Sequence, residues 1–121
     1  MTLTLRLGCV VFALLFSNST FAKVITVQDF VSECLSKTEP CAAFVMGVVE
    51  GARHQTREHF KSQPFAFLVH NNPVCLPNDW GSQKLTEETL RVLINRPDLA
   101  SFSAVSGILV ALSESSSCDE T

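Results

Sequence analysis

The sequence of 121 residues has no tyrosine, one tryptophan and three histidines. It contains no Cys-x-x-Cys, Gly-x-Ser-x-Gly or His-Glu-x-x-His motif and no phosphate-binding glycine loop. These absences exclude the simplest redox, hydrolase, metalloprotease and nucleotide-binding motifs. His54, His59 and His70 have no recognised metal-ligand spacing. We therefore predict no catalytic residues, no metal and no cofactor, in a protein that is not an enzyme.

Excess positive charge is also missing, because the formal net charge is −3. Such a chain binds nucleic acid and anionic membranes poorly. The apolar run from Leu7 to Phe16 is too short to span a bilayer. It follows Arg6 and precedes the mostly small, polar segment Ser17 to Ala22, the order typical of a secretory signal peptide. We expect cleavage after Ala22, with an N-terminal membrane anchor as the alternative.

Cleavage would divide the chain into a signal peptide, residues 1–22, and one domain, residues 23–121. The domain would have 99 residues and eight Lys/Arg against twelve Asp/Glu, a net charge of −4. A domain of this size buries only about two-thirds of its unfolded surface, so covalent cross-links matter to its stability.

Four cysteines remain after Cys9 leaves with the signal peptide. An even number in a small exported chain is typical of a disulfide framework. Cys34 and Cys41 flank a tight turn between two expected helices, and Cys75 and Cys118 flank an expected pair of antiparallel helices. We favour the pairs Cys34–Cys41 and Cys75–Cys118. The pairing Cys34–Cys118 with Cys41–Cys75 is the alternative.

Apolar periodicity and turn residues predict an all-α fold, a small bundle of about four to five helices with two disulfides. Thr26 or Asp29 is expected to cap the first helix. The expected helices cover residues 28–35, residues 41–59, a segment from Gly81 or Ser82 to Asn95-Arg96, and a segment from Pro97 toward Cys118. No strand pair is expected. Residues 62–72 are predicted to contain one helical turn and the turn Asn71-Asn72-Pro73, either as a functional connection or as a lid over the core.

Two helix faces carry further predictions. The second helix has a core stripe of Cys41, Phe44, Val45, Val48 and Ala52. Its small residues Ala43, Gly47 and Gly51 favour close packing against another helix of the same fold, with a homodimer seam as the alternative. The fourth helix has an expected core stripe of Phe102, Val105, Leu109 and Leu112, backed by Ala104, Ile108 and Ala111.

Several of these segments occur together in a recognisable order. They are residues 41–52, then Cys75-Leu76-Pro77, the helix 85–94, Arg96-Pro97-Asp98 and the closing Cys118. In this order the sequence resembles the Rap/Tai family of type VI secretion amidase immunity proteins, over nearly all of residues 23–121. The resemblance implies a helical, disulfide-bonded periplasmic protein, often a homodimer. Its expected partner is a cognate peptidoglycan amidase effector, whose catalytic cleft it occludes.

Polar loop positions at the ends of the expected hairpins are the candidate partner-binding residues. They are Asn71, Asn72, Trp80, Asn95 and Arg96. For Trp80, packing over the open end of the helical hairpin is the alternative. We expect no nucleic-acid partner and no membrane partner after signal cleavage. The alternative function is a periplasmic chaperone-like or envelope-stress protein of similar helical, disulfide-bonded architecture.

Overall fold

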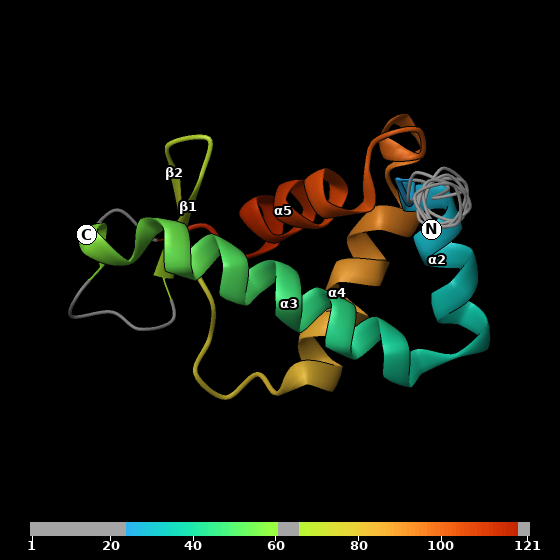
Figure 1. Ribbon diagram of the computed structural model, residues 1–121, viewed down its shortest axis with the longest axis horizontal. Helices are drawn as coiled ribbons and strands as arrows, with labels where there is room; N and C mark the ends of the chain where they lie inside the picture. Colours follow the sequence, from blue (N-terminus) through green and yellow to red (C-terminus); the bar gives the residue numbers. More distant parts are fainter. Residues whose placement is uncertain (1–23, 61–65, 119–121) are drawn as a thin grey trace, which may run out of the picture.

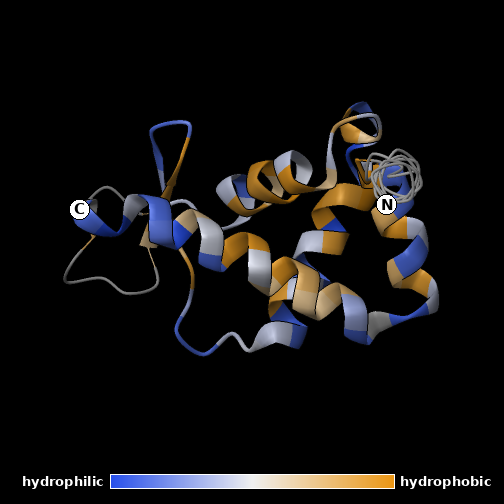
Figure 2. Ribbon diagram, viewed as in Figure 1, coloured by the Kyte–Doolittle hydropathy of each residue, from blue (hydrophilic) through white to orange (hydrophobic). Residues whose placement is uncertain are grey.

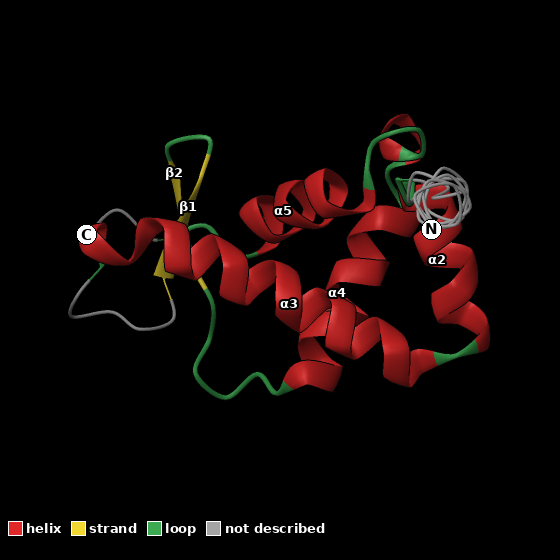
Figure 3. Cartoon of the chain, viewed as in Figure 1, coloured by secondary structure: helices red, strands yellow, loops and turns green. Residues whose placement is uncertain are grey.

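A computed structural model describes residues 24–60 and 66–118, which contain four α-helices and one two-stranded hairpin (Figures 1 and 3). The elements are α2 (Val27–Ser36), α3 (Thr38–Thr56), the 3-10 turn η1 (Arg57–His59), β1 (Ala66–Val69), β2 (Asn72–Cys75), α4 (Ser82–Ile94), η2 (Pro97–Leu99) and α5 (Ala104–Ser115). The expected signal peptide, residues 1–22, lies outside the described residues. The helical class is therefore confirmed, whereas the expectation of no strand pair is wrong. Among the described helices, none is long and apolar enough to cross a membrane.

Helix α3 is central to the arrangement. It contacts α2, α4, α5 and β1, and it crosses the molecule from the side of α2 to the side of the hairpin (Figure 1). Its buried residues recur every three or four positions, as a core-facing helix requires: Cys41, Val45, Val49 and Ala52. Phe44 and Val48, expected in the core, are only partly buried against it. The helix begins at Thr38, because Pro40 fits within the first turn, where backbone N–H groups have no helical partner.

Both disulfides have the predicted pairing. Cys34–Cys41 joins α2 to α3 with Cα atoms 5.6 Å apart, and Cys75–Cys118 joins β2 to the segment after α5 with Cα atoms 4.8 Å apart. The start of α2 also matches the prediction. Its N-cap is Thr26, whose hydroxyl accepts from the Asp29 N–H at 3.2 Å. Short-range signals located the cap and the Cys34–Cys41 pair, because a cap or a short loop depends on only a few neighbouring residues, whereas the Cys75–Cys118 pair followed from the expected order of the helices.

The segment expected to form one helical turn instead forms a β-hairpin. In β1 and β2, Ala66 pairs with Cys75, Phe67 with Val74, Leu68 with Pro73 and Val69 with Asn72. Phe67, Val69 and Val74 are buried, whereas Pro73 is exposed. The prediction failed because four apolar residues are too short a run to distinguish a strand from a helix without knowledge of the partner strand.

The fourth helix starts later than predicted. Pro97–Leu99 is a separate 3-10 turn, and α5 begins only at Ala104, with Ser103 as its N-cap. The intervening loop bonds to the start of α2: the Val27 N–H donates to the Phe102 carbonyl at 2.9 Å and the Gln28 N–H to the Ala100 carbonyl at 3.1 Å. These loop carbonyls satisfy N–H groups that a helix N-terminus leaves without partners, which favours the break between η2 and α5.

The core stripe predicted for this helix is also partly wrong. Phe102 and Val105 are 46% and 47% exposed. The buried face of α5 carries small and aliphatic residues: Ala104, Gly107, Ile108, Ala111 and Leu112. Leu112 and the three predicted backing residues are therefore confirmed as core, and Gly107 was not predicted. The helix is apolar on most of its circumference, as the orange colour of α5 in Figure 2 indicates, so periodicity alone did not separate the buried face from the exposed Val105.

The small residues of α3 do not pack inside the fold. Gly47 and Gly51 are exposed, and a Cβ atom built on either would have no other heavy atom within 4 Å. The close approach occurs at Gly107 of α5, where an added Cβ would overlap the Cγ2 atom of Val27 in α2. The predicted role of close helix packing therefore belongs to Gly107 and not to the α3 glycines.

Candidate partner-binding site

The turn of the hairpin is exposed and polar. His70 and Asn71 occupy the two turn positions with φ values of 48° and 66°, and Asn72 and Pro73 follow them. Two consecutive positive φ values are the geometry of a type I′ turn, whose twist matches that of the flanking strands. The hairpin projects beyond the helices in Figure 1, and its turn is hydrophilic in Figure 2. It therefore presents an imidazole and two carboxamides to solvent on a narrow projection.

The base of this projection is held on several sides. The inward side chains Phe67 and Val74 are fully buried. The Leu68 N–H donates to the hydroxyl of Thr56 in α3 at 3.3 Å. These contacts fix β1 against α3, so the exposed turn is carried by a packed base.

The end of the chain supports the other strand. The Cys75 N–H donates to the Ser116 carbonyl at 2.8 Å, and the Cys118 N–H donates to the Pro73 carbonyl at 3.2 Å. Val74 forms an isolated antiparallel bridge with Ser117. Pro73 is tolerated here because its missing N–H is opposite Leu68, whose own N–H points to Thr56 instead of β2.

Trp80 is half-buried and packs against the hydrophobic core. Its backbone N–H donates to the Pro77 carbonyl at 3.2 Å, which closes the turn before α4. This placement agrees with the alternative of a packing role, since much of the indole is already covered by the protein's own side chains.

Asn95 and Arg96 lie at the end of α4, and both have partners within the protein. The Asn95 amide donates to the Arg91 carbonyl at 2.8 Å. The Arg96 guanidinium donates to both carboxylate oxygens of Asp98, at 2.9 and 2.8 Å, and to Glu114 of α5. These hydrogen bonds raise the pKa of Arg96, and they join the loop before η2 to the last turn of α5.

The five predicted positions do not form one surface. Asn71 and Asn72 lie together at the hairpin turn, whereas α4 ends on the other side of the molecule (Figure 1). His70 lies beside the two asparagines at the turn. The sequence had excluded it as a metal ligand and had predicted no binding role for it. The sequence predicted a turn at Asn71-Asn72-Pro73. The observed turn is centred on His70 and Asn71, one to two residues earlier.

A second surface feature was not predicted. An apolar groove of about 450 Å³ opens between α3 and α5. It is lined by Phe44, Gly47, Val48, Gly51, Ala52, Gln55, Val105 and Leu109. The exposed glycines form one wall because they lack side chains that would fill the groove.

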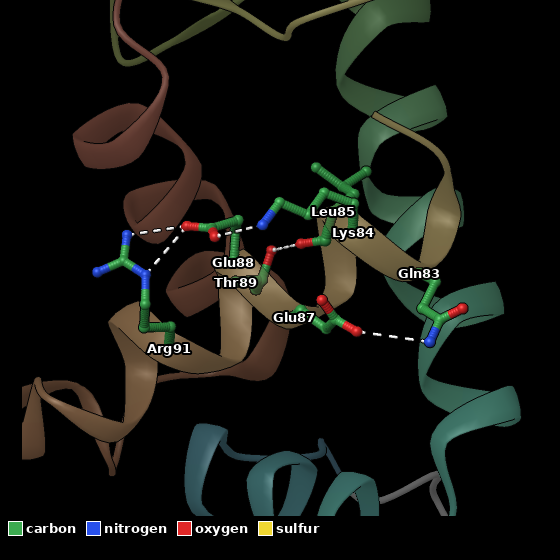
Figure 4. Close-up of polar contacts among 7 residues, drawn as sticks. All are labelled: Gln83, Lys84, Leu85, Glu87, Glu88, Thr89 and Arg91. Carbon is green, nitrogen blue, oxygen red and sulfur yellow. Dashed lines mark hydrogen bonds and ion pairs between the residues drawn. The ribbon is translucent and has the colours of Figure 1, made fainter. Parts of the chain in front are cut away.

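The outer face of α4 is charged, and Lys84, Glu87, Glu88 and Arg91 all bond to side chains of the same helix (Figure 4). Glu88 accepts from Lys84 at 3.1 Å and from Arg91 at 2.9 Å. The Gln83 amide donates to Glu87 at 3.4 Å. Among the described residues, no three His, Cys, Asp or Glu side chains gather as a metal site would require.

These ion pairs predict acid sensitivity. Hydrogen bonds from Arg91 and Lys84 lower the pKa of Glu88 below 4.5, and those from Arg96 lower the pKa of Asp98 below 3.8. A lowered folded-state pKa gives stability that is present above the unfolded pKa and is lost as the pH falls through the folded value. We expect the urea midpoint to fall below about pH 4.5, and to fall less steeply in the variant Glu88→Gln/Asp98→Asn. Equal slopes for both proteins would contradict this prediction.

A model of the family described as Rap1a immunity proteins matches residues 26–118, from the N-cap of α2 to the second disulfide. Searches of the curated proteins and of the solved structures give no match. The family match covers more than half of the chain and includes both disulfides and the hairpin. The chain therefore belongs to the Rap1a family of immunity proteins.

Proposed function

We propose that this chain is a periplasmic immunity protein that occludes the active-site cleft of a type VI secreted peptidoglycan amidase. Membership of the Rap1a family implies neutralisation of a type VI effector, a cognate amidase, by a protein that is not itself an enzyme. Two disulfides fit an oxidising compartment such as the periplasm. Export by the signal peptide of residues 1–22 and a homodimer belong to the same proposal.

The projecting hairpin is the observation that carries the proposed mode of inhibition. Two strands lie only about 5 Å apart, so a hairpin is narrow enough to enter an enzyme cleft. The packed base and the disulfide beside it keep the turn in one conformation. A preordered element loses little conformational entropy on binding, which favours affinity.

The chemistry of the turn suits a polar cleft. The imidazole of His70 and the amides of Asn71 and Asn72 each offer a donor and an acceptor. The polar groups in the catalytic cleft of an amidase must keep hydrogen-bond partners when a bound protein displaces water. We assign these three side chains the role of supplying such partners while the hairpin excludes substrate.

Removal of the turn side chains tests this assignment. The variant His70→Gly/Asn71→Gly keeps residues that tolerate positive φ, so the hairpin is expected to persist. We expect binding to the cognate amidase to weaken by about 30-fold or more, the effect of losing a contact worth about 2 kcal/mol. Calorimetry measures the affinity, and peptidoglycan hydrolysis measures the inhibition.

Asn95→Ala is the matched control, because it removes a carboxamide that the sequence also suggested for binding. We expect it to leave inhibition unchanged. Loss of inhibition in this variant, with full inhibition by the hairpin variant, would move the binding surface to the end of α4. Full inhibition by both variants would overturn occlusion by the hairpin turn.

A chaperone-like function is the second candidate, and the open apolar groove between α3 and α5 favours it. Such a function predicts that the protein suppresses aggregation of an unfolded client. It also predicts that the variant His70→Gly/Asn71→Gly suppresses this aggregation as well as the unchanged protein does, since the groove residues are the same. Light scattering of an aggregating client at increasing concentrations of this protein separates the two functions. In a separate measurement, light scattering of this protein alone gives its mass and so tests for the homodimer.

A further inference from the structure

The two disulfides differ in their accessibility. Cys34 and Cys41 are 1% and 4% exposed, inside the contact between α2 and α3. Cys75 and Cys118 are both partly exposed, at the edge of the small sheet. Thiol–disulfide exchange requires a thiolate to reach one sulfur of the bond, so access influences its rate. A reductant in solution should therefore reach the second disulfide well before the first.

The accessible disulfide is also the one beside the candidate binding element. Cys75 is the last residue of β2, and the turn residues His70 and Asn71 lie four to five residues before it. Cys118 belongs to the segment after α5, which bonds to β2 twice. The Ser116 carbonyl accepts from the Cys75 N–H, and the Cys118 N–H donates to the Pro73 carbonyl. These two backbone bonds form the isolated bridge between Val74 and Ser117, and the disulfide is the covalent link between β2 and the chain end.

The rest of the core does not depend on this link to the same degree. The contact between α2 and α3 has its own buried disulfide, and α4 and α5 contact each other directly. The hairpin is held inward by Phe67 and Val74, but its turn and Pro73 are exposed. Opening of the second disulfide would therefore loosen the outer part of the hairpin before it loosened the helices.

We propose that the Cys75–Cys118 disulfide is a redox-sensitive clamp that sets the position of the hairpin and so controls partner binding. The control of binding rests on the proposed function of the hairpin. With the bond closed, the turn is presented in one conformation. With the bond open, the outer part of the hairpin samples more conformations, and ordering it on binding costs affinity.

The chemical step is an ordinary exchange with a dithiol, either dithiothreitol or a dithiol oxidoreductase. One reductant thiolate attacks Sγ of Cys75 or Cys118 and breaks the S–S bond, which leaves the other cysteine as a thiolate that takes up a proton. The second thiol of the reductant, as its thiolate, then attacks the mixed disulfide and releases the protein cysteine, which takes up a proton. The protein gains two electrons and two protons as two thiols, and the reductant leaves as its own disulfide.

The clamp can be tested without any effector. The folded protein is treated with graded dithiothreitol, its thiols are alkylated, and the labelled cysteines are identified by mass spectrometry. We expect Cys75 and Cys118 to be labelled at least tenfold faster than Cys34 and Cys41, with helical circular dichroism retained. We also expect amide exchange in residues 66–75 to accelerate at least tenfold while that of α3 changes little. Labelling of all four cysteines together, or unchanged exchange in the hairpin, would overturn the clamp.

The link to binding is tested on protein that is reduced in the same way but not alkylated, after the reductant is removed. We expect the selectively opened protein to bind the cognate amidase at least tenfold more weakly, and reoxidised protein to recover its affinity. The variant Cys75→Ser/Cys118→Ser should match the opened state, and Cys34→Ser/Cys41→Ser is the control in which the clamp stays closed. Equal affinity of the opened and closed proteins would overturn control of binding. If the closed protein does not bind the amidase, the proposed function fails. The rates of cysteine labelling and of amide exchange then decide alone whether the disulfide holds the hairpin.

Discussion

Replacing Phe67 by alanine is expected to lower the free energy of unfolding by about 3–5 kcal/mol. Phe67 is fully buried and lies on β1, which contacts both α3 and α5. Its removal leaves a cavity that rigid helices can fill only in part. Total stabilities of such domains are about 5–15 kcal/mol, so this one change removes a large share. Urea unfolding followed by circular dichroism measures the loss.

Phe102→Ala is the matched control, since it removes the same ring from a site that is 46% exposed. The backbone carbonyl of Phe102, which accepts from the Val27 N–H, stays in place. We expect a change within about 1 kcal/mol, as for most surface substitutions. The sequence pattern made the opposite assignment for Phe102, so a large loss in this variant would restore that assignment.

Gly107→Ala is expected to lower the free energy of unfolding by about 2–3 kcal/mol, in the upper part of the range for overpacking. The new Cβ would overlap Cγ2 of Val27 and also touch Leu93 at 3.6 Å. Val27 is buried and β-branched in a helix, where it has one strongly preferred rotamer. The side chain therefore cannot turn away, and α2 and α5 have to separate. Thermal and urea unfolding both report the change.

The same substitution at Gly47 is expected to have the opposite sign. Gly47 lies in the interior of α3 with nothing within 4 Å of an added Cβ. Alanine there reduces the conformational entropy of the unfolded chain, so stability should rise by up to about 1 kcal/mol. A loss of stability in Gly47→Ala in the isolated monomer would contradict the open groove. Similar losses at both glycines would contradict the assignment of Gly107 as the close-packing position.

Local signals in the sequence were sufficient for the parts of the fold that depend on near neighbours. The hydroxyl of Thr26 caps α2, Gly81 precedes α4, and Asn95 ends it. The disulfide pairs followed from helix order, because antiparallel neighbours bring their open ends together. Each of these features involves residues close in the chain or a single topological step.

The features that were missed depend on partners far away in the sequence. Residues 100–102 turn because their carbonyls meet the first turn of α2, about seventy residues earlier. β2 is bonded to the segment after α5, which the pattern of residues 66–75 does not reveal. For α5, an almost uniformly apolar sequence left the buried face open, and Gly107 decided it through contact with Val27.

For the candidate site, the sequence located the exposed turn but not its conformation. Asn71 and Asn72 were suggested as turn residues, and Asn71 tolerates the positive φ that the turn requires. Arg96 was suggested for its charge, but its position next to both Asp98 and Glu114 depends on the packing of η2 and α5. Whether a charge is available to a partner is therefore a property of the tertiary structure.

The hydrogen bonds between α2 and the loop at residues 100–102 also bear on the order of folding. The ribosome makes the chain from its N-terminus, so α2 is synthesised long before Ala100 and Phe102. Its first N–H groups then have only water as a partner, and long-range pairings of this kind form slowly. The first turn of α2 therefore gains these backbone partners only after residues 100–102 have been made, and we expect it to become ordered late in folding.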